Sequence, residues 1–385
     1  MPLTLGVPKE VKVREKRVAL TPEGAGQLAG KGISVFIQRG AGQASGFSDT
    51  AYEAAGAVLV PDAAALYGQA RLIVKVKEPQ PSEFGLLRTD HLLFCYLHLA
   101  SPENHPLLQA LLKSGVTAAA FETVEKDGRR PLLKPMSEIA GGLAAAYGTY
   151  LVPLLGKMTG SLKLPSDFHA SLERIASLYP EPPAGGVSPY ALIWGGGVAG
   201  EKALEFCLKM GAKAALVENN PGRREELSAK FSQKSAAFFS PENLPAEVLE
   251  ASELLIGCVH QAGARALRVL SESSLERSSK SIKKVMVDIS IDQGGNFPQS
   301  EPRTYDDPVY LDTFGNLRFT VTNMPSLCGP AASKALEAAI LPYAAALALD
   351  AERAFKEDPG LRLAVNVQAG NIVNEAVRRA HHEDH

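Results

Sequence analysis

Short apolar runs alternate with longer amphipathic stretches along most of the 385-residue chain. The apolar runs have the length and composition of strands buried in a parallel sheet. They are residues 3–7, 34–38, 72–77, 92–97, 117–122, 190–194, 214–217, 254–258, 285–289 and 318–322. Strands that alternate with helices in this way form doubly wound sheets. The pattern therefore predicts an α/β fold with one sheet before residue 135 and a second one after it.

A dinucleotide-binding unit is indicated around residues 195–200. The strand-like run before them leads directly into the sequence GGGVAG, which has the G-x-G-x-x-G spacing at Gly195, Gly197 and Gly200. In this motif the glycines allow a tight turn, close approach of a pyrophosphate and close packing of the following helix. The next strand-like run ends at Glu218, where a carboxylate can bind a ribose diol. A glycine-rich turn in an ordinary α/β domain would not account for Glu218.

The C-terminal part of the chain has a different pattern. Past residue 330 the chain is expected to be helical, with residues 331–349 rich in alanine, to have no strand of its own and to pack on the first sheet. The predicted architecture is a flavodoxin-like doubly wound substrate domain, made of residues 1–135 and 330–385. A Rossmann domain, residues 136–329, is inserted into it.

Composition narrows the functional class. Lys and Arg number 40 and Asp and Glu 42, so charge gives no reason to expect nucleic acid or an anionic membrane as a partner. No uninterrupted apolar run is judged long enough to span a bilayer, and residues 3–8 have no signal-peptide pattern. Cys95, Cys207, Cys258 and Cys328 lack metal-ligand spacing and are expected to be reduced core thiols. A cytoplasmic protein without a bound metal is predicted.

Four polar residues fall at positions where chemistry is common. Lys77 and His98 lie at the ends of strand-like runs, where open α/β sheets bind ligands. Arg17 precedes an apolar turn, and Asp292 comes just before two glycines. Taken singly, Arg17 fits a surface salt bridge and Lys77 a solvated strand end. By the same reasoning, His98 fits a structural histidine and Asp292 a turn cap.

Short stretches distributed in order over the chain change this picture. They are GVPKE at 6–10, RVALTP at 17–22, GAG at 40–42, SGFSD at 45–49, KVKEP at 75–79, YLHLA at 96–100, PMSEIAG at 135–141, the glycine motif, DQGG at 292–295 and NMP at 323–325. With these stretches the chain resembles the family of alanine dehydrogenases and pyridine nucleotide transhydrogenases over nearly its whole length.

The resemblance implies NAD-dependent oxidative deamination of L-alanine to pyruvate and ammonium, together with the reverse reductive amination. It implies that Arg17 and Lys77 grip the substrate carboxylate and carbonyl. It also implies that His98 exchanges protons at the reacting carbon, a task suited to an imidazole. Asp292 would meet the substrate when the cleft between the two domains closes. A nearby Arg17 is further expected to lower the pKa of Lys77.

The resemblance also implies a set of cofactor-binding positions. They are Ser137, Gly195, Gly197, Val198, Gly200, Glu218, Arg223, Val259 and Asn323. Arg223 would stack on the adenine. Relatives of this type are homo-oligomers, so a dimer or hexamer is expected, and the apolar helix at residues 331–355 is a candidate for the dimer contact. Hinges are expected near residues 135–137 and 325–330.

Three alternatives stay open. Another amino-acid or imino-acid dehydrogenase of the family is one, the nucleotide-binding subunit of transhydrogenase is the second, and a catalytically silent nucleotide sensor is the third. The stretches YLHLA and DQGG favour a dehydrogenase. The chain departs from the family pattern at residues 160–188, 259–263 and 326–329, which puts subunit assembly, cofactor affinity and substrate range in question. Residues 159–188 are interpreted as a connector around a helix at 167–177.

Overall fold

The computed structural model describes residues 3–157, 164–183, 189–232, 234–260 and 265–382. Parts of the expected connector and of the segment 259–263 therefore lie outside the described residues. The chain divides into two compact units. Unit 1 comprises Met1–Met136 and Ser326–His385, and unit 2 comprises Ser137–Pro325.

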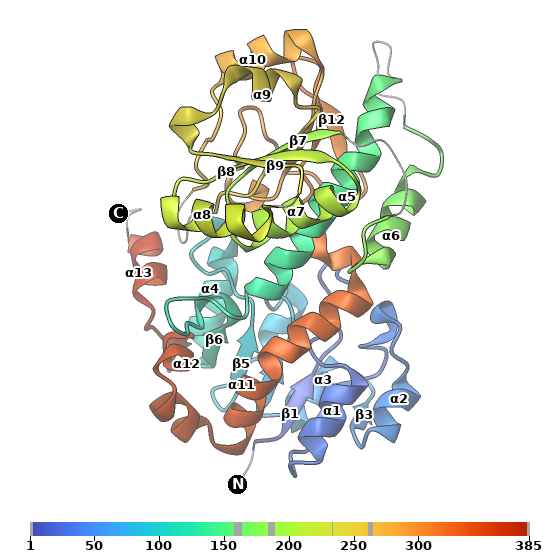
Figure 1. The fold of residues 1–385 in the computed structure, drawn as a ribbon. Helices are drawn as coiled ribbons and strands as arrows, with labels where there is room; N and C mark the ends of the chain where they lie inside the picture. Colours follow the sequence, from blue (N-terminus) through green and yellow to red (C-terminus); the bar gives the residue numbers. More distant parts are fainter. Residues whose placement is uncertain (1–2, 158–163, 184–188, 233, 261–264, 383–385) are drawn as a thin grey trace. The chain divides into compact units, whose positions relative to one another are not determined.

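Unit 1 is built on an eight-stranded sheet (Figure 1). In spatial order its strands are β15 (Asn371–Ile372), β14 (Val365–Gln368), β6 (Thr117–Ala120), β5 (Leu92–Cys95), β4 (Leu72–Val74), β1 (Leu5–Val7), β2 (Val35–Gln38) and β3 (Val58–Val60). Strands β1 to β6 run parallel in the order 3-2-1-4-5-6. The doubly wound class is confirmed. The strand order is that of dinucleotide-binding sheets, whereas the expected flavodoxin-like order is 2-1-3-4-5.

The C-terminal segment contributes two strands, so the expectation that it has none is wrong. Strand β14 pairs antiparallel with β6 and forms a hairpin with β15. The turn between them consists of Ala369 and Gly370, with φ angles of 47° and 75°, as a two-residue hairpin turn requires. The sequence does not predict these strands because they are short and because the buried position between Val365 and Val367 is an asparagine.

Helices cover the sheet of unit 1. They are α1 (Pro22–Ala29), α2 (Asp49–Ala54), α3 (Ala63–Gln69), α4 (His105–Ser114), α11 (Gly329–Glu357), α12 (Pro359–Leu363) and α13 (Glu375–His382). Helix α11 packs against α1 and β4 (Figure 1). The core under these helices is made of side chains such as Leu66, Ile73, Leu93, Leu111 and Val367. The C-terminal helix therefore completes a domain that begins at the N-terminus.

Unit 2 is a seven-stranded sheet with a single antiparallel edge strand, β12. In spatial order the strands are β12 (Val309–Leu311), β13 (Leu317–Phe319), β11 (Val285–Asp288), β10 (Leu254–Gly257), β7 (Tyr190–Trp194), β8 (Lys213–Val217) and β9 (Ala236–Phe239). Its helices are α5 (Lys134–Gly156), which begins in unit 1, α6 (Phe168–Leu178), α7 (Val198–Lys209), α8 (Pro221–Lys230), α9 (Ala246–Ala251) and α10 (Glu272–Ser281). The parallel strands again follow the dinucleotide-binding order.

Helix α5 approaches its neighbours in unit 2 very closely. A Cβ atom at Gly141 would overlap the carbonyl oxygen of Ala199 in α7, and one at Gly148 would overlap the side chain of Leu254 in β10. Only glycine permits such backbone approach. These contacts explain why α5 is rich in small residues, and they fix the position of α7, the helix that follows the glycine motif.

Helices α5 and α11 are each long and apolar enough to cross a membrane by length and composition. This corrects the expectation that no segment qualifies, which considered only apolar runs without interruption. Most residues of the apolar window in α5 are buried inside the protein, and about half of those in the window of α11 are. Core helices of folded proteins meet the same criterion, so the finding is weak evidence for a membrane partner.

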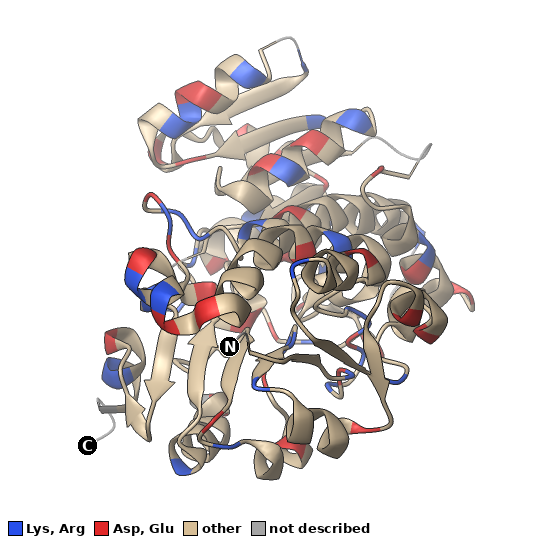
Figure 2. Ribbon diagram, turned by 90° about the horizontal axis from the view of Figure 1, so that it is seen from below, with Lys and Arg blue, Asp and Glu red and all other residues tan. Residues whose placement is uncertain are grey.

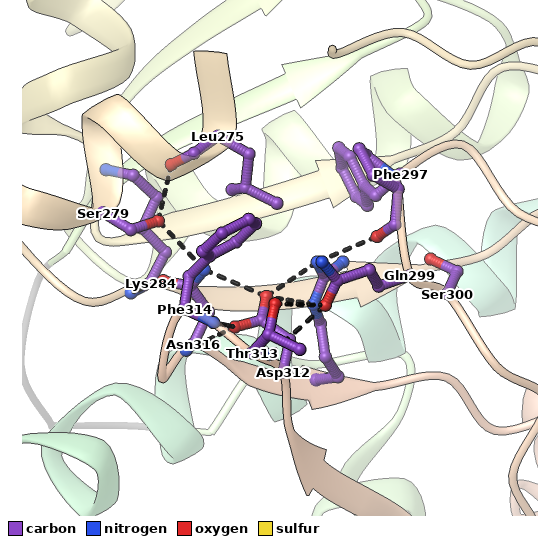
Figure 3. A network of polar contacts seen from close by, with 12 residues as sticks. Leu275, Ser279, Lys284, Phe297, Gln299, Ser300, Asp312, Thr313, Phe314 and Asn316 are labelled. Atoms are coloured by element: carbon purple, nitrogen blue, oxygen red, sulfur yellow. Dashed lines mark hydrogen bonds and ion pairs between the residues drawn. The ribbon is translucent and has the colours of Figure 1, made fainter. Parts of the chain in front are cut away.

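A polar network around Asp312 organises one edge of the sheet in unit 2, and Figure 3 shows Asp312 in it with Asn316 and Ser279. The Arg318 guanidinium contacts Asp312 Oδ2 at 2.8 Å, and both side chains are fully buried. Asp312 also accepts hydrogen bonds from the backbone N–H groups of Phe314 and Asn316. The Asn316 side chain extends the network to Ser279 at the end of α10. The network thus connects β13 to the loop before it and to a helix.

The distribution of charged residues and the state of the four cysteines agree with what the composition predicts. Figure 2 shows Lys and Arg interspersed with Asp and Glu along the same helices, as a net charge of −2 suggests. All four cysteines are buried and free, which confirms the expectation of reduced core thiols.

Candidate active site

Arg17 lies in the extended segment before α1, and its backbone is held from both sides. The Ser45 hydroxyl donates to the carbonyl oxygen of Lys16, and the Ser333 hydroxyl of α11 accepts the Val18 N–H at 3.0 Å. The two hydroxyls are 2.9 Å apart. Four residues further along α11, Glu337 accepts the Thr21 side-chain hydroxyl at 2.9 Å and the Thr21 N–H. The C-terminal helix therefore fixes the segment that carries Arg17.

The Arg17 side chain is buried rather than on the surface, with 2% of the residue exposed. Its Nε and Nη2 donate to the two carboxylate oxygens of Glu15 at 2.6 and 2.5 Å, and Nη1 contacts Met136 Sδ. The sequence suggested a salt bridge on the surface for Arg17. The residue does form a salt bridge, but a buried one. The expected two-bond grip on a substrate carboxylate is also absent from this arrangement, because that side of the guanidinium is bonded to Glu15.

Lys77 lies three residues beyond β4 and is half-buried. Burial, with the positive charge of Arg17 as the next cause, lowers the pKa of Lys77. The direction agrees with the sequence-based prediction. The neighbouring Glu78 is bonded to Lys12, with Nζ and Oε1 2.5 Å apart. Lys77 and Arg17 therefore form a pair of cations suited to an anionic substrate.

A second group of charges lies next to Lys77. The Lys75 side chain is fully buried, and its Nζ is 2.9 Å from Glu83 Oε1 and 3.4 Å from Glu10 Oε2. Glu10 Oε1 accepts the N–H of Val76 at 2.7 Å, which holds this carboxylate against the backbone between the two lysines. Tyr67 donates to Glu83 at 3.2 Å.

His98 lies in the loop after β5 and is exposed. Its backbone has a φ of 49°, a left-handed conformation that costs energy for a residue other than glycine. The carboxylate of Glu122, in the short 3-10 turn after β6 (Phe121–Thr123), holds this loop by accepting the N–H groups of Leu97 and His98. The imidazole stacks parallel to the ring of Tyr96, with centroids 5.7 Å apart. His98 is therefore presented to solvent in a fixed orientation.

The glycine motif of unit 2 has the geometry of a phosphate cradle. Gly195 has a φ of 96°, and a Cβ atom at Gly200 would overlap the carbonyl oxygen of Gly195. At Gly197, the first position before α7, a Cβ would meet nothing within 4 Å, and no side chain caps the helix. The space beside Gly197 is therefore open and no side chain caps the start of α7, which fits the pyrophosphate of a dinucleotide. Val198 begins α7 and is partly exposed.

Glu218 follows β8 and is fixed beside this cradle. Its two carboxylate oxygens accept the N–H of Gly196 at 2.6 Å and the N–H of Asn220 at 2.7 Å. Arg223 Nε donates to the carbonyl oxygen of Gly196, and its guanidinium pairs with Glu201 and Glu226. Arg223 therefore lies next to the cradle, but its guanidinium is engaged by carboxylates.

The loop after β11 is organised by Asp288 rather than by Asp292. Asp288 is fully buried and accepts hydrogen bonds from the backbone of Asn296 and from Ser300. Asp292 is exposed, on a short 3-10 turn (Ile291–Gln293) that Gly294 ends with a φ of 93°. Its carboxylate is thus directed to solvent and is not needed to hold the loop.

The remaining predicted cofactor positions also lie in unit 2. Val259 is anchored to Asn296, which bonds both its N–H and its carbonyl oxygen. Asn323 has a φ of 55° just after β13, and Ser137 is half-buried in α5.

Each unit gathers one set of the predicted residues. Unit 1 holds Arg17, Lys77 and His98, and unit 2 holds the predicted cofactor residues and Asp292. Sequence analysis missed Glu15 and Glu122, which hold Arg17 and the His98 loop. An acidic residue at the end of the strand next to a histidine-bearing strand was a usable signal for Glu122. For Glu15, two residues before Arg17, the sequence offers no comparable signal.

Comparisons with known proteins cover the whole chain. Residues 6–140 match the family model for the N-terminal domain of alanine dehydrogenase/PNT, and residues 183–375 match that for the C-terminal domain. An alanine dehydrogenase of Halomonas elongata is 38% identical over 381 residues, which cover 98% of this chain and 96% of that protein. One from Methanococcus maripaludis is 36% identical over 383 residues, with the same coverage.

Solved structures give the same result. An L-alanine dehydrogenase superposes with a TM-score of 0.85 at 33% identity, covering 99% of both chains. A transhydrogenase from Sinorhizobium meliloti superposes with a TM-score of 0.74 at 21% identity, covering 97% of this chain and 99% of that one. The second likeness shows a shared fold alone.

Proposed function

Because the chain belongs to the alanine dehydrogenase and pyridine nucleotide transhydrogenase family, we propose that it catalyses the reversible NAD-dependent oxidation of L-alanine to pyruvate and ammonium. The observation that carries this proposal is the likeness to alanine dehydrogenases over 98% of the chain. The cations and the exposed histidine of unit 1, with the glycine cradle of unit 2, supply the groups that this reaction needs. The buried free thiols fit a reducing compartment such as the cytoplasm.

Each residue has a defined task in this reaction. Lys77 binds the substrate carboxylate or carbonyl oxygen, and the buried charge of Arg17 strengthens the attraction. His98 accepts a proton from the substrate ammonium group as the Cα hydrogen leaves as hydride, and it returns protons as water adds to the imine and ammonia departs. Its stacking on Tyr96 holds the imidazole in one orientation for these transfers. The lowered pKa of Lys77 makes the lysine a better proton donor to a developing oxygen.

The cofactor is proposed to be NAD, bound through the glycine cradle, with Glu218 at the ribose. The N–H groups at the start of α7 would hold the pyrophosphate. When bound, NAD accepts the hydride. In the resting arrangement Arg223 pairs with Glu201, so stacking on adenine would require this pair to open.

The proposed function is tested by following NAD reduction spectrophotometrically with a panel of amino acids, and NADH oxidation with pyruvate plus ammonium. L-Alanine is expected to give the highest kcat/KM. Reduction of NAD only with another amino acid would assign a different dehydrogenase, and no reaction with any of them would refute the proposal.

NAD is expected to give a higher kcat/KM than NADP, by about tenfold or more. Glu218 keeps a negative charge at the ribose, and like charges facing each other cost up to several kcal/mol. Steady-state kinetics with both cofactors measure this preference. Glu218→Gln should narrow it, whereas Glu225→Gln, at an exposed acid of α8, should leave it unchanged. Equal efficiency of the two cofactors in the unmodified protein would contradict the assignment.

Lys77→Met is expected to lower kcat/KM for pyruvate by about 10- to 100-fold, because a hydrogen bond to a charged group is worth ~1.5–3 kcal/mol. The matched control is Lys12→Met, which removes a cation that is paired with Glu78 and partly exposed. Its effect should be several times smaller. Similar losses in the two variants would mean that only the overall charge matters, not a contact made by Lys77.

The protein is proposed to be a homodimer or a larger assembly of dimers. One face of α11 carries Ala338, Pro342, Ala346 and Leu349 at exposed positions, and Leu349 is 44% exposed. A second copy of the same face could bury these apolar side chains. Light scattering at micromolar concentration measures the mass, and a particle of 40.9 kDa, the mass of one chain, would refute the proposal.

A further inference from the structure

Glu10 is the carboxylate left with the longest ion-pair contact when the buried charges around Lys75 and Lys77 are paired. Arg17 is bonded to Glu15, Lys75 lies closer to Glu83 than to Glu10, and Lys12 is bonded to Glu78. Within the described parts of the chain Lys77 has no ion pair, and Glu10 Oε2 is buried without a hydrogen bond. Around the two lysines, Glu10 is therefore the most weakly paired anion, with a 3.4 Å contact to a Lys75 that Glu83 shares, and Lys77 is the cation without an ion pair. Binding of an anionic substrate to Lys77 would leave the Glu10 charge uncompensated.

We propose that Glu10 takes up a proton when a substrate carboxylate binds at Lys77 and Arg17, so that the charge of the buried cluster stays balanced. This inference rests on the proposed function, because it requires the substrate carboxylate at these cations. Glu10 itself does not touch the substrate. Its carboxylate is held by the backbone N–H of Val76, between Lys75 and Lys77, and its charge acts on the substrate site from there.

The acidity of Glu10 makes this uptake feasible near neutral pH. Burial raises the pKa of Glu10 to about 7, with Glu15 and Glu83 adding to the rise and Lys75 opposing it. Two of the groups facing Glu10, Lys75 and Tyr67, keep their protons in this range because their pKa values are raised. Burial lowers the pKa of Lys75, but Glu10 and Glu83 more than offset this and raise it overall. Burial also raises the pKa of the Tyr67 hydroxyl.

The sign of the coupling follows from these charges. A bound carboxylate adds negative charge and raises the pKa of Glu10 further. Well below pH 7 the group already holds its proton, so binding takes up none. Above pH 7 the free protein has lost the proton and must regain it on binding. Affinity for the substrate should therefore fall as pH rises, by up to about tenfold per pH unit.

The test uses pyruvate with saturating NAD, a pair in which neither molecule has a hydride to give. Titration calorimetry in buffers of different ionisation enthalpy counts the protons taken up per pyruvate bound. At about pH 8 the unmodified protein is expected to take up a sizeable fraction of one proton. Glu10→Gln should abolish the proton uptake that is due to Glu10 and leave any uptake that is due to Lys77. At that pH the variant should also bind pyruvate more tightly than the unmodified protein.

The matched control is Glu337→Gln. Glu337 is another buried carboxyl whose pKa burial raises, but it faces Thr21 and Gly24 rather than the substrate cations. Because Glu337 also supports the segment that carries Arg17, pyruvate affinity is expected to fall in this variant, but the number of protons taken up per pyruvate bound should be unchanged. A purely structural role of Glu10 would instead weaken pyruvate binding in Glu10→Gln at every pH.

The outcomes separate this inference from the proposed function. If the unmodified protein binds no pyruvate, the proposed function fails. If it binds pyruvate but Glu10→Gln takes up as many protons, the inference is overturned and the proposed function stands. If Glu10→Gln does not fold, the pH dependence of pyruvate affinity in the unmodified protein tests the inference instead. An affinity that does not change between about pH 7 and 8.5 would overturn it.

Discussion

His98→Ala is expected to lower the turnover number by about 10²- to 10⁴-fold, the usual loss when a general acid–base group is removed. The loop should survive the change, because Glu122 holds the backbone N–H of residue 98 and Asn104 holds its carbonyl oxygen, neither of which needs the imidazole. NAD affinity should change little. It can be followed by the fluorescence of Trp194, the single tryptophan of the chain, which directly precedes Gly195.

His105→Ala is the matched control for this prediction. His105 is also exposed in unit 1, where its ring lies near that of His381. Its removal should leave the turnover number within about twofold of the unmodified protein. A folded His98→Ala protein that keeps most of its activity would show that His98 is a structural residue of its loop.

Arg318→Met is expected to lower the free energy of unfolding of unit 2 by about 3–5 kcal/mol. The substitution removes the cation but leaves the Asp312 carboxylate fully buried. Urea denaturation followed by the fluorescence of Trp194 measures the effect selectively. This side chain is buried in β7 against Phe297, so its emission reports on unit 2.

The control is Lys280→Met, which removes an exposed lysine that pairs with Glu276 on the surface of α10. Such pairs contribute ~0–1 kcal/mol. Replacing both Asp312 and Arg318 with apolar residues should cost less than Arg318→Met alone, because no buried charge is then left unpaired. Equal stability of Arg318→Met and the unmodified protein would show that solvent or rearrangement compensates Asp312.

The sequence predicted those features whose cause is local. The central strands are continuous apolar runs, and the glycine motif is required by the φ of Gly195 and the contact at Gly200. Strands β3 and β15 were missed because they lie at sheet edges. Val58, for example, is 51% exposed, so no long apolar run marks its strand.

The site was predictable in residue type but not in its pairings. Lys77 and His98 follow strands, and that position can be read from hydrophobic periodicity. The bond that Glu15 makes with Arg17 and the support of the His98 loop by Glu122 depend on side-chain placement that no periodicity encodes. The charge left on Glu10 is a further example, because it becomes visible only when all neighbouring ion pairs are known.

The discontinuity of unit 1 has a consequence for synthesis on the ribosome. Ser333 and Glu337 of α11 hold the segment around Arg17, and strand β14 pairs with β6. All three partners are translated after the whole of unit 2. Domains generally fold as units as they emerge, so unit 2 can be complete while the first 136 residues still lack helices α11 to α13 and two strands of their sheet. The nascent segment of residues 1–136 therefore keeps part of its apolar surface uncovered until the end of the chain is released.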